Sequence, residues 1–282
     1  MKAPKAYQVK RFVTGALIHL ELIIVAIIVL YPLLWVVGSS INPVNGINRG
    51  TMIPDNPTLD NYIRLFQKTK FTAWYINTLY VAVLSTVFSM ILHTMTAFCF
   101  ARFKFKGRKM GLLLVMILQM FPSFLGLTAL YMVALNFGML NNLNMLVIIY
   151  VAGGIPGNIW LVRGYMLNIP RSIDEAAFID GASKIQLFAK IILPLSMPIV
   201  FFIAVTAFMG PWMDYMMPRY LINMNERRTL AIGLFDLVSR SNNDFTAFCA
   251  GCVLVAIPIT IMYMVFQRFL LEGLTAGANK GE

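Results

Sequence analysis

The sequence predicts an all-α integral membrane protein with six transmembrane helices, built as a single domain over residues 1–282. Hydrophobic residues make up 59% of the chain and charged residues only 12%, against roughly 25% charged residues in soluble domains. A water-soluble domain of this size would have too few charges to cover its surface. The chain also contains six long apolar stretches, and a helix needs about 20 apolar residues to cross the hydrocarbon core.

The first predicted helix covers about residues 16–41 and follows a basic N-terminal segment. This apolar run is longer than the 7–15 residues typical of a cleaved signal peptide, so we expect the helix to be retained. The core helices of the domain then occupy about residues 74–270. They are predicted at about 74–101, 110–135, 144–165, 191–212 and 247–269.

Basic residues between the second and third predicted helices indicate the orientation. Residues 102–109 read RFKFKGRK, with five Lys or Arg residues in eight. If this segment, both termini and residues 163–190 face the cytoplasm, that side holds fifteen Lys and Arg residues and the outside holds eight. The positive-inside rule therefore predicts a multi-pass protein of the cell membrane with both termini in the cytoplasm. Topology and anionic lipid headgroups explain the net charge of +11, so membrane lipid is the expected partner and nucleic acid is not.

Two external segments are longer than turns. Within residues 42–73, Leu59, Tyr62, Ile63 and Phe66 share one helical face, which is typical of a short amphipathic helix lying on the membrane. Residues 214–246 form the longest external loop. This loop is polar enough to face water and large enough to contact a partner.

The sequence lacks the motifs of several classes of enzyme. No GxxxxGK[ST] loop is present, so we do not expect the chain to bind ATP, and no HExxH or GxSxG motif occurs. Cys249 and Cys252 have CxxC spacing but no neighbouring His and no second pair, which indicates small residues of a membrane helix rather than a metal site. His19 and His93 lie in apolar spans, where packing or an interhelical hydrogen bond is the expected role. We therefore expect neither a catalytic nor a metal site.

The segment 168–198, NIPRSIDEAAFIDGASKIQLFAKIILPLSMP, has the pattern of two short cytoplasmic helices. Ser172 as N-cap with Glu175 at the third position predicts a capping box and a helix over about residues 173–180. Gly181 is expected to end that helix. Ser183 can begin a second helix that continues toward Leu193.

This segment resembles the signature of ABC importer permeases, which is EAA, three residues, Gly, nine residues and then I-x-L-P. The matching residues, with every spacing kept, are Glu175, Ala176, Ala177, Gly181, Ile191, Leu193 and Pro194. The resemblance implies a type I ABC importer permease fold in which loop 168–194 couples to a separate ATPase. It implies that Glu175 contacts the ATPase, that Ala176 and Ala177 pack in its groove, and that Gly181 permits the turn.

The resemblance extends along the chain. NTLYVAVLST, TAFCFARFKFKG and LTAGANKG are similar to the shorter permease subunit of maltose-type oligosaccharide importers. This implies that Thr275 and Gly277, in a tail over residues 271–282, touch the ATPase. Other segments, such as YVAGGIPGNIWLVRGY, resemble members from Gram-positive bacteria, with maltodextrin as the first expected substrate and galacto-oligosaccharide as the next. No sugar-binding residue is assigned, because the longer permease holds most of the sugar in such importers.

The partners that the resemblance implies are a second, longer permease, two ATPase subunits that bind ATP and Mg²⁺, and an extracellular solute-binding protein reached by the 214–246 loop. The alternative is an ion-coupled secondary sugar carrier. Such a carrier usually holds its coupling ion with carboxylates inside the membrane. Glu21 is the one acidic residue within the predicted spans, which favours a transporter powered by a separate subunit.

Overall fold

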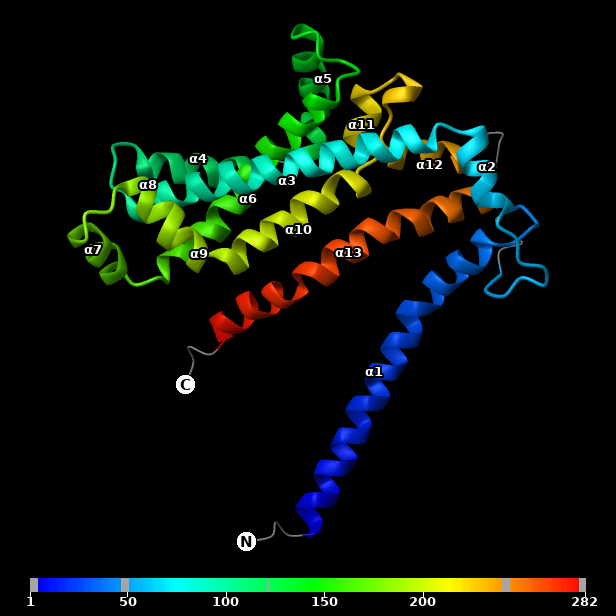
Figure 1. Cartoon of the computed structure of the whole chain (residues 1–282), viewed down its shortest axis with the longest axis horizontal. Coiled ribbons are helices and arrows are strands. Elements are labelled where there is room, and N and C mark those ends of the chain that lie inside the picture. Colours follow the sequence, from blue (N-terminus) through cyan, green and yellow to red (C-terminus); the bar gives the residue numbers. More distant parts are fainter. Residues whose placement is uncertain (1–4, 47–50, 121, 240–243, 279–282) are drawn as a thin grey trace. The chain divides into compact units, whose positions relative to one another are not determined.

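The computed structural model describes residues 5–46, 51–120, 122–239 and 244–278, and all regular structure in this part of the chain is helical (Figure 1). The all-α class is thus confirmed. The helices are α1 (Lys5–Ser40), α2 (Asp60–Lys68), α3 (Phe71–Arg102), α4 (Arg108–Met120), η2 (Ser123–Gly126), α5 (Leu127–Asn136), α6 (Leu143–Leu167), α7 (Arg171–Ile179), α8 (Lys184–Gln186), η3 (Leu187–Ile192), α9 (Leu193–Leu195), α10 (Met197–Met213), α11 (Met216–Leu221), η4 (Asn225–Arg227), α12 (Leu230–Ser239) and α13 (Phe245–Ala278).

Four continuous helices are long and apolar enough to cross a membrane: α1, α3, α6 and α13. Two further spans are possible if each of two bent helix pairs counts as one span, which would give the predicted six. The predicted boundaries of the second and fourth spans agree with α3 and α6 within a few residues.

A sharp bend divides each of the other two predicted spans. The stretch at 110–135 separates into α4 and α5 around Pro122, which has extended backbone (ψ 123°) and has no amide hydrogen to donate to a helix. The stretch at 191–212 bends by 80° between residues 184–195 and α10. Its first residues therefore belong to the preceding loop, and the continuous helix begins only at Met197.

The chain forms two compact units, residues 1–69 with 234–254 and residues 70–233 with 255–282. In the second unit, α3 packs against α6 and α10. Fully buried Ala82, Ala97 and Ala101 line α3, and such small residues let membrane helices approach closely. One core cluster at the end of α3 includes Phe98, Met166 and Ile203.

A polar network organises the first unit. The Asn61 side chain on α2 donates hydrogen bonds to the carbonyls of Ser40 (2.9 Å) and Asn42 (2.8 Å) at the end of α1. Arg64, one turn further along α2, pairs with Asp244 at 2.8 Å. The Asp244 carboxylate also accepts from the amide of Ala247, which caps the start of α13. The amphipathic α2 is thereby tied to the end of α1 and the start of α13.

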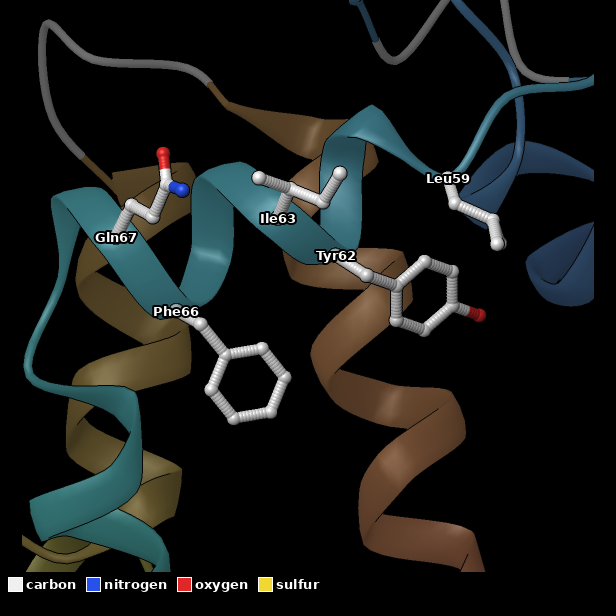
Figure 2. Close-up of a pocket in the computed structure, with 5 residues that line it drawn as sticks. All are labelled: Leu59, Tyr62, Ile63, Phe66 and Gln67. Atoms are coloured by element: carbon white, nitrogen blue, oxygen red, sulfur yellow. The ribbon is translucent and has the colours of Figure 1, made fainter.

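The outer face of α2 is apolar and open. Leu59, Ile63 and Phe66 are exposed, and they line a shallow groove of about 580 Å³ together with Tyr62 and Gln67 (Figure 2). The predicted amphipathic helix is present with the expected residues on one side. Its contact with the membrane surface stays a prediction.

Candidate functional site

The short helices of the 168–194 loop gather at one end of α3 and α6 (Figure 1). Helix α7 begins at Arg171, directly after Pro170, whose backbone (φ −57°, ψ 138°) is extended. The predicted N-cap at Ser172 is therefore wrong, and α7 has no side-chain cap. Proline ends the preceding structure one residue before Ser172 and turns the chain into the helix, so Ser172 lies inside the first turn.

Helix α7 has one face in the chain's own core and one face at the surface. Asp174 and Ala177, three residues apart, are 9% and 5% exposed. Glu175 and Ala176, which lie between them in the sequence, are exposed. Ile179, at the end of α7, is 86% exposed. Of the two signature alanines, the structure thus places Ala177 in this chain's own core and leaves Ala176 at the surface.

Exposed apolar side chains surround this outer face. Phe178 is 46% exposed, and Ile185, in α8, is 78% exposed. Ile179, Phe178 and Ile185 thus present apolar surface within one loop, and exposed apolar surface marks protein interaction sites. Sequence analysis did not single out these residues, although large apolar residues at the polar end of a membrane domain were a usable signal.

A buried ion pair ties α7 to the end of α3. The Nε atom of Arg102 lies 3.0 Å from Oδ2 of Asp174, and its two terminal nitrogens each donate to the carbonyl of Ile169 at 3.2 Å. Burial raises the pKa of the Asp174 carboxyl, and this effect outweighs the opposite effect of the Arg102 and Arg171 charges. The guanidinium thus joins three segments: α3, the α6–α7 connection and α7.

The turn after α7 is a Schellman motif. The amide of Ala182 donates to the carbonyl of Ala177 (2.9 Å), and the amide of Gly181 donates to that of Phe178 (3.1 Å). Gly181 has φ +79°, a conformation that favours glycine. The prediction that Gly181 ends the helix is confirmed.

Ser183 begins the next helix, as predicted. Its hydroxyl accepts from the amide of Gln186, and the Gln186 side chain accepts from the amide of Ser183, so the capping box lies here. The chain continues as a π-helix over Leu187–Ile192 into the short helix Leu193–Leu195. The signature residues Ile191, Leu193 and Pro194 lie in this continuation, with Pro194 exposed.

The predicted tail continues α13. This helix runs through Thr275 and Gly277 to Ala278, and the surroundings of these two residues lie outside what the structure describes. Among the residues that the structure describes, no group of three or more His, Cys, Asp or Glu side chains could hold a metal ion.

A rigid loop lies at the other end of α3. Asn141, with φ +60°, accepts through its side chain from the amides of Asn223 (2.6 Å) and Met224 (3.0 Å). From α3, Trp74 donates to the carbonyl of Asn225 at 2.9 Å. These bonds hold the backbone and leave the side chains of residues 223–227 exposed. Part of the predicted external loop 214–246 therefore has a fixed shape.

A buried histidine links α3 and α6. His93 contacts the carbonyl of Val151 through Nε2 (2.9 Å) and the side-chain nitrogen of Asn158 through Nδ1 (2.9 Å). Because the amide nitrogen is a donor, Nδ1 accepts and Nε2 donates. A Cβ atom at Gly154 would lie 2.9 Å from the His93 ring, so glycine makes room for it. The interhelical hydrogen bonding expected for His93 is confirmed.

Residues 85–275, more than half of the chain, match the family of inner membrane components of binding-protein-dependent transport systems. The chain belongs to this family.

Curated relatives of this permease cover almost its whole length. A galactooligosaccharides transport system permease protein, GanQ of Bacillus subtilis (strain 168), is 39% identical over 97% of this chain and 98% of its own. The maltodextrin transport system permease protein MdxG of the same organism is 39% identical over 93% of this chain and 95% of its own.

A solved structure supports the fold of the permease. A chain of a bacterial ABC transporter involved in the import of the acidic polysaccharide alginate aligns with a TM-score of 0.78 at 23% identity, over 96% of this chain and 99% of that one.

Proposed function

We propose that this chain is the permease subunit of an ABC importer for oligosaccharides and that its 168–194 loop transmits the motion of a separate ATPase. The observation that carries the coupling role is the division of α7 into two faces. Glu175 and Ala176 are exposed beside the apolar Phe178 and Ile179, which suits contact with a partner protein. On the opposite face, Ala177 and the Asp174–Arg102 pair fix α7 to α3.

This arrangement favours lever-like coupling. A partner that binds the exposed face of α7 would displace the buried face with it, because tightly packed interiors do not deform continuously. The displacement would reach α3 through Arg102 and α6 through the Ile169 carbonyl. ATP-driven movement of the ATPase would thereby change the tilt of the spans that form half of the translocation pathway.

The proposed partners are a second, longer permease, two ATPase subunits and an extracellular solute-binding protein. The relatives named for maltodextrin and galactooligosaccharide transport support a sugar substrate, and their equal identities favour neither one. We retain maltodextrin as the first candidate and galacto-oligosaccharide as the second. A related solved transporter is in complex with a pentasaccharide-bound periplasmic protein, which supports the solute-binding partner, and the rigid loop 223–227 is a suitable contact surface.

The test is gentle purification of the chain from its native membrane, followed by identification of the proteins that accompany it. We expect a second permease, an ATPase and a sugar-binding protein. In proteoliposomes, ATP hydrolysis by this complex should be stimulated by the binding protein loaded with maltodextrin or galacto-oligosaccharide. A chain that purifies alone and moves sugar without ATP would overturn the proposal in favour of a secondary carrier.

A further inference from the structure

Five basic residues without an acidic partner gather between α3, α4 and α6. We define this basic cluster as Lys104, Lys106, Arg108, Lys109 and Arg163. Within the part of the chain that the structure describes, no ion pair involves the basic cluster. The positive charge of the cluster is thus not neutralised by the described part of the chain.

Two arginines of the cluster lie on α4 and α6, which contact each other. Arg163, near the end of α6, donates from Nε to the carbonyl of Phe100 (3.3 Å), and its guanidinium lies 5.5 Å from the centre of the Trp160 ring. These contacts hold its charge in place. Arg108 is the first residue of α4, and a Cβ atom at Gly111, three residues further along, would lie 3.1 Å from the ring of the same Phe100. Two like charges held near each other repel, and a bound anion would relieve that repulsion.

An apolar surface continues from the charged end of α4. Met110, Leu113 and Leu114 in its first two turns are 59%, 44% and 53% exposed. Phe105, in the connection before α4, is 46% exposed and packs on Phe100 with 5.5 Å between ring centres. A ligand that follows this surface would meet fixed positive charge first and hydrocarbon-like side chains next.

We propose that the Arg108–Arg163 pair, with the surrounding lysines, binds the phosphate of an anionic membrane phospholipid whose acyl chains lie along the exposed side of α4. A free phosphate ion would use only the charged part of this surface. A phospholipid uses both parts, and basic pockets between membrane helices are known to hold anionic headgroups. This site is separate from the 168–194 loop and does not depend on which solute is transported.

The test is native mass spectrometry of the full chain, with any subunits that copurify, titrated with phosphatidylglycerol or with phosphatidylcholine of identical acyl chains. Phosphatidylglycerol should bind more tightly. R108Q/R163Q should bind it about thirty-fold more weakly, since each surface cation contributes about five-fold, while phosphatidylcholine binding should not change. A matched control is K68Q/K70Q, which removes two exposed charges elsewhere and should bind phosphatidylglycerol as the unmodified chain does.

Three results would overturn the site. Equal affinity for both lipids would indicate apolar adsorption only. Unchanged phosphatidylglycerol binding by R108Q/R163Q would place the lipid elsewhere. Displacement of the lipid by millimolar inorganic phosphate would indicate a free-anion site. If the double variant does not fold, R108Q alone should weaken binding about five-fold, and R108K/R163K should preserve it.

Discussion

Arg102 and Asp174 carry opposite charges in a place where little water reaches them. The Arg102 side chain is 2% exposed and that of Asp174 is 12% exposed. Taking both charges out of water offsets much of their attraction, so we expect the pair to contribute little net stability. The main effect of the pair is on geometry, because it fixes the position of α7 against α3.

Removing one partner of this pair should therefore do more harm than removing both charges. Arg102→Ala leaves a buried carboxylate unpaired, and we expect a loss of about 3–5 kcal/mol in the free energy of unfolding. Arg102→Ala/Asp174→Ala removes both charges and should cost less, because no unpaired charge is then left in the interior. Thermal melting of the purified protein in detergent measures both.

The variant Arg102→Asp/Asp174→Arg exchanges the two charges. It tests whether the attraction between them, and not the shape of each side chain, holds α7 in place. It should recover part of the melting temperature that Arg102→Asp alone loses. If the exchange recovers nothing and Arg102→Ala melts as the unmodified protein does, Arg102 does not hold α7.

Gly154 tests the contact between α3 and α6, and its neighbour Gly153 supplies the control. A Cβ atom at Gly154 would meet the His93 ring at 2.9 Å, whereas one at Gly153 would meet nothing within 4 Å. Gly154→Ala should displace His93 from Val151 and destabilise the protein by about 1–3 kcal/mol. Gly153→Ala should change stability by less than about 1 kcal/mol. Equal melting temperatures for the two variants would contradict this packing.

At the scale of the element, the C-terminal end of α7 depends on the turn at Gly181. The turn needs a left-handed residue at Gly181, and open space surrounds that position, so a substitution there acts through backbone strain alone. Placing an ordinary L-residue in the left-handed conformation costs about 1–2 kcal/mol. Gly181→Val should cost more than this, because valine is β-branched. Asparagine adopts this conformation more readily, so Gly181→Asn should be milder.

The readout for Gly181 is the ratio of sugar uptake to ATP hydrolysis in reconstituted vesicles, with the amount of assembled complex measured separately. Gly181→Val should lower uptake sharply while insertion into the membrane persists, and Gly181→Asn should fall between this variant and the unmodified chain. Full uptake with valine at this position would show that the turn geometry does not matter for coupling.

The elements that local sequence patterns encode were predicted well, and those that depend on distant contacts were not. The Gly181 turn and the Ser183 helix start agree with the structure because each needs only neighbouring residues. The Ser172 cap failed because Pro170 begins α7 earlier. The bend of 80° between residues 184–195 and α10 was missed because apolar residues continue across it. No local pattern could pair Arg102 with Asp174, since 71 residues separate them.

At the scale of the whole molecule, the position of acidic residues bears on the source of energy. Glu21 on α1 is the one acidic residue among the candidate spans that the structure describes. Carboxylates that hold a coupling ion normally face a bundle interior or a water-filled cavity. A single carboxylate in one candidate span is weak evidence for such a site.

We therefore expect transport to follow ATP and not an ion gradient. In vesicles that contain the purified complex, uptake of labelled oligosaccharide should need ATP and the binding protein, and should survive a protonophore. Glu21→Gln should retain most of the uptake, because a neutral side chain replaces a carboxylate that binds no coupling ion. A protonophore-sensitive uptake that Glu21→Gln abolishes would instead identify Glu21 as an ion-coupling group, and the ATPase-coupling role proposed for α7 would then have to be abandoned.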